Sequence, residues 1–236
     1  MNDIDSFLNS QTPTAMRPLL GQTVLLVEDS LTSCEAIRLM CLRSGARIRR
    51  ADCIESARRH LRIYRPTVVL IDMGLPDGDG ASLISEIHNS DQRVGVILGL
   101  SADAGLRQSA MDAGADGFIE KPIASIAAFQ AQIIGHLPIH MRPMGPRKAC
   151  DEAVKPDQIA LQEDLAHALN LLEDGDPTPV THTYLATFLA GVARTASDTE
   201  LETMTQAFAK ARSMAGPEKQ QLSGALMDRL AQKQAI

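Results

Sequence analysis

Short apolar runs alternate with stretches of helical spacing over the first 137 residues of the chain. The apolar runs are rich in Val, Ile and Leu, as in strands that are buried on both faces of a sheet. They predict strands at residues 23–27, 46–51, 67–71, 94–100 and 116–119. Between them, apolar residues recur every three or four positions, which predicts helices at residues 30–44, 54–64, 81–89, 103–113 and after Pro122 as far as about Leu137. Five such units with short right-handed crossovers predict an α/β fold with one doubly wound, five-stranded parallel sheet.

The pattern changes on either side of this block. Residues 1–20 are polar and contain two prolines, so we expect a flexible leader ahead of a domain at residues 21–138. Prolines and charges crowd residues 139–156, which predicts a linker that is semi-rigid where proline is dense. Residues 157–236 show helical periodicity throughout, and its breaks predict an all-α region of four amphipathic helices. These helices can pack as a small bundle or lie against a partner chain, and the sequence leaves both open.

The excess of negative charge lies in the all-α region. The formal net charge of the chain is −6. Residues 1–150 carry 16 acidic and 16 basic side chains, whereas residues 151–236 carry 13 acidic and 7 basic ones. Modules that bind nucleic acid are normally basic, because release of counterions from the phosphate backbone supplies much of their affinity. The charge pattern therefore disfavours DNA binding by the C-terminal helices.

Neither the cysteines nor the first residues suggest secretion or a membrane anchor. The four cysteines form no CxxC pair, which favours reduced thiols in the interior of a cytosolic protein. The first residues include Asp3 and Asp5 and have neither the cationic start nor the apolar core of a signal peptide. No run approaches the roughly 18–20 apolar residues that a membrane-spanning helix needs. We therefore expect a soluble, cytoplasmic protein without membrane contact.

Charged side chains follow three of the predicted strands at the point where each strand ends. Glu28 and Asp29 follow the first strand, Asp72 follows the third and Lys121 follows the fifth. Because ligands bind beyond the carboxyl ends of strands in open α/β sheets, we expect three carboxylates and one ammonium to converge there. Mg²⁺ prefers oxygen ligands, and phosphoryl transfer to a carboxylate requires a cation that neutralises the phosphoryl oxygens. The pattern predicts a site for a divalent cation and a phosphoryl group, with Asp72 as the acceptor.

Two further groups complete this predicted site. Ser101, at the end of the fourth strand, offers a hydroxyl to a phosphoryl oxygen, and Lys121 offers a point cation to another. Residues 73–80 after Asp72 are rich in turn formers, and the turn can direct the carbonyl oxygen of Gly74 to the cation. The predicted ligands of the cation are Glu28, Asp29, Asp72 and the Gly74 carbonyl.

These residues resemble the receiver domain of bacterial two-component response regulators, the CheY-like family. The resemblance runs over residues 23–137 and rests on five motifs in the family's order. They are Glu28-Asp29, Asp72, Pro76, Ser101-Ala102 and Lys121-Pro122. The resemblance implies a flavodoxin-like receiver in which Asp72 accepts a phosphoryl group from a phosphohistidine on a sensor histidine kinase or a histidine phosphotransfer protein. It also implies Mg²⁺ as cofactor, bound directly by Asp29 and Asp72 and largely through water by Glu28.

The resemblance further assigns a switch to Ser101 and Phe118. On phosphorylation, Ser101 moves inward to meet the phosphoryl oxygen and Phe118 follows it, which remodels the face of the fourth helix, fifth strand and fifth helix. Such a change is a two-state element biased by a local charge. Plain core packing is the alternative interpretation of Phe118. Two departures from the family are Ser in place of the commoner Thr at position 101, and Gly74, whose missing side chain exposes the phosphoryl group to water.

One other feature of the sequence has more than one interpretation. Arginines surround the second predicted strand and helix, and they form either a docking surface for an acidic partner, such as the protein's own C-terminal region, or a solvated charged face. They are Arg43, Arg47, Arg49, Arg50, Arg58, Arg59, Arg62 and Arg65.

The histidines of the all-α region do not fit a phosphotransfer site. His167 and His182 lack the lysine and small residue one turn on that a phosphotransfer histidine needs. The sequence therefore disfavours phosphotransfer by the C-terminal region.

The sequence as a whole predicts a response regulator whose C-terminal helices act on an unknown protein target or by self-association, for example as a homodimer. The alternative is a transcriptional regulator whose C-terminal helices bind DNA. A recognition helix exposes several basic residues, whereas the second and third predicted helices offer only Arg194, Lys210 and Arg212. An output enzyme ranks last, because residues 151–236 show no cluster of catalytic groups. We expect a phosphoacceptor signalling protein with at most slow self-dephosphorylation, and no enzyme.

Overall fold

A parallel sheet of five strands forms the centre of the N-terminal part of the chain. The computed structural model describes residues 12–145, 152–174, 178–211 and 216–231. The sheet consists of β1 (Thr23–Val27), β2 (Arg47–Ala51), β3 (Val68–Asp72), β6 (Val96–Ser101) and β7 (Gly117–Glu120). The strand order is β2-β1-β3-β6-β7, and each neighbouring pair is parallel. This order is that of the doubly wound, flavodoxin-like fold, as the sequence predicts.

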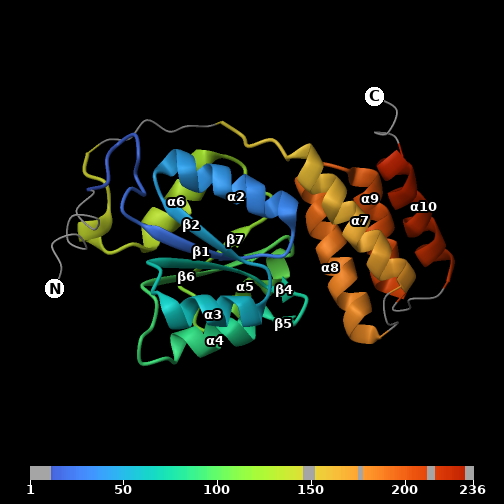
Figure 1. Cartoon of the computed structure of the whole chain (residues 1–236), viewed down its shortest axis with the longest axis horizontal. Helices are drawn as coiled ribbons and strands as arrows, with labels where there is room; N and C mark the ends of the chain where they lie inside the picture. Colours follow the sequence, from blue (N-terminus) through green and yellow to red (C-terminus); the bar gives the residue numbers. More distant parts are fainter. Residues whose placement is uncertain (1–11, 146–151, 175–177, 212–215, 232–236) are drawn as a thin grey trace. The chain divides into compact units, whose positions relative to one another are not determined.

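Helices cover both faces of this sheet (Figure 1). One face carries α2 (Leu31–Ser44) and α6 (Ile126–His136), and the other carries α3 (Ile54–Ile63), α4 (Gly80–His88) and α5 (Arg107–Asp112). All residues of β3 and β6 are buried, which explains why both sequences are free of polar side chains up to their last residues, Asp72 and Ser101. The last of the three helices on the second face is shorter than predicted, because a 3₁₀ turn, η1 (Ala104–Leu106), precedes it.

The side chains between the sheet and the second group of helices form one apolar cluster. Ile71 and Ile97 are among the strand residues, and Leu83 and Ile84 of α4 pack in the same cluster. All four are fully buried. Burial of one such side chain stabilises the fold by about 1.5–3 kcal/mol. The cluster therefore fixes α4 on the sheet, and with it the segment that connects β3 to α4.

This connecting segment differs from the sequence-based prediction. The sequence predicts a turn-rich loop over residues 73–80, and the structure forms an antiparallel hairpin there, of β4 (Gly74–Leu75) and β5 (Gly78–Asp79). Each strand has two residues, too few for an alternating pattern to be visible in the sequence. The second strand begins at Gly78, directly after the turn, and its φ of +156° is rarely adopted by residues with a side chain.

The C-terminal helices form a bundle with a core of its own. They are α7 (Gln158–Asp174), α8 (Pro179–Thr195), α9 (Thr199–Ala211) and α10 (Pro217–Ala231). Leu172, Leu185, Leu189, Phe208 and Leu226 are fully buried in its apolar cluster. Of the two arrangements that the sequence left open, the structure therefore shows a bundle. The chain divides into two compact units, one of Met1–Asp29 and Ala36–Lys155, the other of Ser30–Glu35 and Pro156–Ile236.

Within the second unit, a buried carboxylate binds the residues that begin α2. Asp164 accepts hydrogen bonds from the Ser30 hydroxyl at 2.8 Å and from the backbone N–H groups of Leu31 and Thr32 at 2.8 and 2.9 Å. The Ser30 hydroxyl oxygen in turn accepts a bond from the Ser33 N–H at 3.2 Å. Ser30 thus caps the helix, and Asp164 satisfies two further N–H groups that the helix itself leaves without acceptors.

Parts of the expected leader and linker lie outside the described residues, namely residues 1–11 and 146–151. In the described part of the leader, Leu19 is fully buried and its N–H donates to the Ser44 carbonyl at 2.8 Å. The linker contains a 3₁₀ turn, η2 (Ile139–Met141). Among the described helices, none has the length and apolar character needed to cross a bilayer.

Candidate functional site

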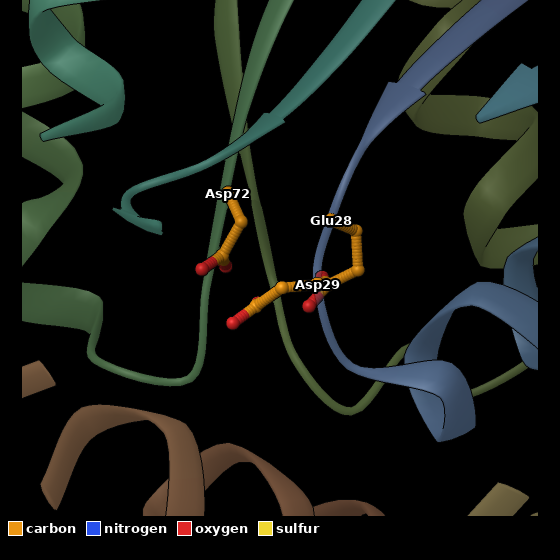
Figure 2. Close-up of side chains that lie close together, drawn as sticks. All are labelled: Glu28, Asp29 and Asp72. Carbon is orange, nitrogen blue, oxygen red and sulfur yellow. The ribbon is translucent and has the colours of Figure 1, made fainter. Parts of the chain in front are cut away.

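Three carboxylates meet beyond the carboxyl ends of β1 and β3, which are neighbouring strands. Glu28 extends the ladder past β1 by donating its N–H to the Ala51 carbonyl at 3.0 Å, and Asp72 is the last residue of β3. Glu28 is 1% exposed and Asp72 5%, whereas Asp29 is half-buried. One oxygen from each of the three lies within 4.8 Å of the others, and their side chains point toward one another (Figure 2).

Lys121 supplies the positive charge of the cluster. Its Nζ donates hydrogen bonds to Glu28 Oε2 at 2.8 Å and to Asp72 Oδ1 at 2.7 Å. Its backbone N–H donates to the Ser101 carbonyl at 2.8 Å, and the peptide bond that follows it, to Pro122, is cis. β7 therefore places the ammonium group against the acidic residues of β1 and β3, as the sequence predicts.

The site holds more negative than positive charge. Burial raises the pKa of Glu28 to about 8; the Lys121 ammonium opposes this shift, and the charges of Asp72 and Asp29 add to it. Burial alone would lower the pKa of Lys121, but the charges and hydrogen bonds of Asp72 and Glu28 raise it above its ordinary value. One ammonium group thus faces three carboxyl groups. A divalent cation at this position would balance the remaining charge.

The residues present fit a magnesium ion. All three side chains offer carboxylate oxygens, which are the hard ligands that Mg²⁺ prefers, and a site with few protein ligands leaves room for the waters that it retains. Gly74 also lies beside the cluster, since its N–H donates to Asp72 Oδ2 at 3.0 Å. The coordination of a cation by the Gly74 carbonyl stays a prediction.

Ser101 and Phe118 are both buried in the structure. Ser101 follows directly after Leu100, the register partner of Asp72, and its hydroxyl oxygen accepts a hydrogen bond from the Asp103 N–H at 3.0 Å. Phe118 is 2% exposed and belongs to the apolar cluster beneath the second group of helices, with the Arg107 guanidinium carbon 5.0 Å from its ring centroid. Phe118 thus packs in the core, and a switching movement would begin from this position.

Two residues that hold the site in place were not singled out from the sequence. A Cβ on Gly80 would lie 2.1 Å from the backbone oxygen of Asp72, so only glycine allows α4 to start so close to the end of β3. Asp77 accepts hydrogen bonds from the N–H groups of Ile54 and Glu55 at 2.8 and 3.0 Å and so caps α3. The glycine-rich composition of residues 74–80 was a visible signal for the close approach at Gly80. The cap by Asp77 has no local signal in the sequence, because Ile54 and Glu55 lie 23 and 22 residues before it.

Comparison with models of protein families identifies the family of this part of the chain. Residues 24–132 match the model described as "Response regulator receiver domain". This part of the chain is a response regulator receiver domain. The match includes β1 from Val24 onward, the other four strands of the sheet and all the predicted site residues, and it ends within α6.

Curated relatives of this chain include two transcriptional regulatory proteins. The KDP operon transcriptional regulatory protein KdpE of Escherichia coli (strain K12) is 26% identical over 182 residues, covering 75% of this chain and 77% of that protein. The virulence transcriptional regulatory protein PhoP of Salmonella typhi is 32% identical over 101 residues, covering 42% of this chain. The chain spans only 45% of the length of that PhoP.

Solved receiver domains are similar to this one over about half of the chain. The receiver domain of the sensor histidine kinase PA1611 from Pseudomonas aeruginosa PAO1, with a magnesium ion coordinated in its active site cleft, is 29% identical. It covers 49% of this chain and 96% of that one, with a TM-score of 0.45. The chemotaxis response regulator CheY4 of Vibrio cholerae is 20% identical, with coverages of 49% and 98% and a TM-score of 0.46.

Proposed function

We propose that this chain is a response regulator in which Asp72 accepts a phosphoryl group from a phosphohistidine on a sensor histidine kinase or a histidine phosphotransfer protein. The observation that carries the proposal is the convergence of Glu28, Asp29 and Asp72 at one sheet edge, with Lys121 bonded to two of them. The receiver-domain match over residues 24–132 supports the same reaction. Glu28, Asp29 and Asp72 would hold Mg²⁺, which supplies positive charge opposite the phosphoryl oxygens.

Three side chains of the protein, Asp72, Lys121 and Ser101, take part in the transfer. A carboxylate oxygen of Asp72 attacks phosphorus, an acyl phosphate bond forms, and the bond from phosphorus to the histidine nitrogen breaks with its electron pair on the imidazole. Lys121 neutralises one phosphoryl oxygen, and the Ser101 hydroxyl donates to another after leaving its bond with the Asp103 N–H. The protein acts as a cytoplasmic signalling switch, and its own catalysis extends at most to slow self-dephosphorylation.

The Asp72→Asn variant tests the acceptor. Incubated with acetyl phosphate and Mg²⁺, the full-length wild-type chain should gain the mass of one phosphoryl group in intact-protein mass spectrometry, and the variant should gain none. Asp91→Asn is the matched control, because Asp91 is an exposed carboxylate outside the site. Full labelling of the Asp72 variant would show that another residue is the acceptor. A wild-type chain that takes no label with any phosphodonor would overturn the proposal as a whole.

For the output, we propose that the helical bundle acts on a protein partner or on a second copy of the chain. DNA binding is the alternative, and the description of KdpE and PhoP as transcriptional regulatory proteins favours it. The ion pairs of the bundle argue against DNA binding. Arg194 pairs with Glu202, and Arg229 with Asp198 and Glu200, so the carboxylates of the bundle already neutralise these two arginines.

A gel-shift titration of the phosphorylated full-length chain against mixed genomic fragments separates the two outputs. Protein-directed output predicts no retardation at physiological salt. A retarded complex whose affinity falls steeply with salt concentration would establish DNA binding instead, because such a slope reports phosphate contacts.

A further inference from the structure

Four of the arginines in the arginine-rich stretch lie on or directly after α3, and three of them surround a cavity. The cavity has a volume of about 230 Å³ and lies between α3, α4 and the segment before β6. Arg58, Arg62 and Arg65 line it from one side, at helical spacing along one stripe of α3 and the residues after it. Arg59 lies on the same helix but does not line the cavity.

The cavity has an apolar floor beneath these guanidinium groups. Leu61 comes from α3, Ile87 from α4, and Val94 from the residues that lead into β6. Ile87 and Val94 are buried. A hollow of this kind takes up an apolar side chain, whereas the flat charged face expected of solvated arginines has no such floor.

The charges around the cavity are not balanced. Glu86 is the acidic residue of the lining, and Arg58 occupies it with two hydrogen bonds of 2.9 and 2.7 Å. Arg65 donates to the backbone carbonyl of Arg93, which holds its side chain in place without neutralising it. Within the described part of the chain, no ion pair involves Arg62. Two guanidinium charges therefore remain available for an anionic group.

Size and composition narrow the choice of occupant. Sites for whole small molecules usually measure about 300–1,000 Å³, so this cavity suits a single side chain with its neighbours outside. A nucleic acid backbone has no apolar side chain to place on the floor of the cavity, whereas a peptide segment has one. Arginine pairs well with carboxylates because its planar guanidinium presents two parallel donors.

We propose that this cavity docks an acidic segment of a partner protein, with an aliphatic side chain in the hollow and flanking carboxylates on Arg62 and Arg65. The surface is independent of the phosphoryl site. Arg65 and Val94 come shortly before β3 and β6, at the amino ends of these strands, whereas the carboxylate cluster lies at the carboxyl ends. A partner bound at the cavity, near the amino ends of the strands, therefore leaves the carboxylate cluster accessible.

Fluorescence anisotropy with the full-length chain tests this docking surface. The probe is a labelled eight-residue peptide in which Glu and Leu alternate, and the reference peptide carries Gln in place of Glu. We expect saturable binding of the acidic peptide, at least tenfold weaker binding by Arg62→Glu, and binding within twofold of wild type by Arg59→Glu, the charge-matched control. Arg62→Ala should lie between, and circular dichroism should be unchanged in all three variants.

Several outcomes would overturn the docking proposal. Absence of saturable binding, equal affinity for the Gln peptide, or an equal loss in the Arg59 variant would each exclude a specific acidic site. A DNA duplex that binds more tightly than the peptide and loses affinity in the Arg62 variant would assign the surface to nucleic acid. The Asp72→Asn variant should bind the peptide as wild type does, so failure of this surface and failure of the phosphoryl site are separate results.

Discussion

Lys121 bonds two of the three clustered carboxylates, Glu28 and Asp72, and its replacement by methionine tests what this charge does. Removing one partner of a buried ion pair typically costs about 3–5 kcal/mol, so we expect a large loss of stability in urea unfolding without metal. Mg²⁺ should bind the Lys121→Met variant more tightly than wild type in calorimetric titration, because the competing positive charge is gone. Labelling by acetyl phosphate should fall, since one phosphoryl oxygen loses its cation.

The two readouts at Lys121 separate its possible roles. A variant that loses stability but is phosphorylated at the wild-type rate would show that the ammonium only holds the fold. Lys121→Arg keeps the charge but changes its shape from a point to a plane. We therefore expect it to retain most of the stability and to label more slowly than wild type.

Asp198 makes the stability of the helical bundle depend on pH. It caps α9 by accepting a bond from the Leu201 N–H at 2.9 Å, and it pairs with Arg229 at 2.6 Å. The Arg229 hydrogen bonds hold the pKa of Asp198 below its ordinary value, against the opposing effect of partial burial. Since the folded state favours the charged form, this pair stabilises the bundle above about pH 4, and its contribution disappears as the pH falls through the lowered pKa.

The Asp198→Asn variant isolates this charge, because asparagine also caps helices well. At neutral pH we expect its free energy of unfolding to lie about 1 kcal/mol below wild type, and the difference to shrink toward zero in acid. Urea unfolding followed by circular dichroism over an acid pH series measures this difference. A gap that stays constant with pH would mean that the charge pair contributes nothing and that the substitution acts on packing.

At the level of elements, the contact between α4 and β3 fixes the position of Asp72. A Cβ on Gly80 would meet the backbone oxygen of Asp72 at 2.1 Å and the Met73 Cα at 2.9 Å. Both are main-chain atoms, so Gly80→Ala must move a strand end or a helix start. We expect a loss of about 1–3 kcal/mol in urea unfolding and slower labelling of Asp72 by acetyl phosphate.

The matched control for Gly80 is Gly135, which lies in α6, where an added Cβ would meet no atom within 4 Å. Gly135→Ala should leave labelling unchanged and stabilise the chain slightly, because alanine restricts the unfolded state more than glycine does. Should both substitutions slow the labelling equally, the close approach of α4 to β3 would not be what positions the acceptor.

The elements themselves were predictable because their patterns are long and their ends are marked. The sheet strands are continuous apolar runs, and the helices of the bundle start at residues such as Pro179 and Pro217, at first helical positions. The carboxylate cluster followed from these strands, since parallel strands end at one edge. The residues that support the cluster could not be predicted from the strands. Asp77 caps α3 from a different loop, and Asp164 caps α2 from α7, more than 130 residues away. Such contacts depend on the tertiary structure and leave no local pattern.

On the scale of the whole molecule, a signalling switch needs a phosphorylated state whose contacts differ from those of the free state. In the free state Phe118 is packed in the core and the Ser101 hydroxyl oxygen accepts the Asp103 N–H, and the proposed switch moves both side chains from these positions. We expect the phosphoryl mimic beryllofluoride, added with Mg²⁺, to draw this hydroxyl to Asp72 and so change the association state or the protection of the bundle. Sedimentation velocity and hydrogen exchange over α7–α10 measure the two effects. Asp72→Asn should show neither, and identical profiles for wild type with and without the mimic would leave the receiver domain without an output through these helices.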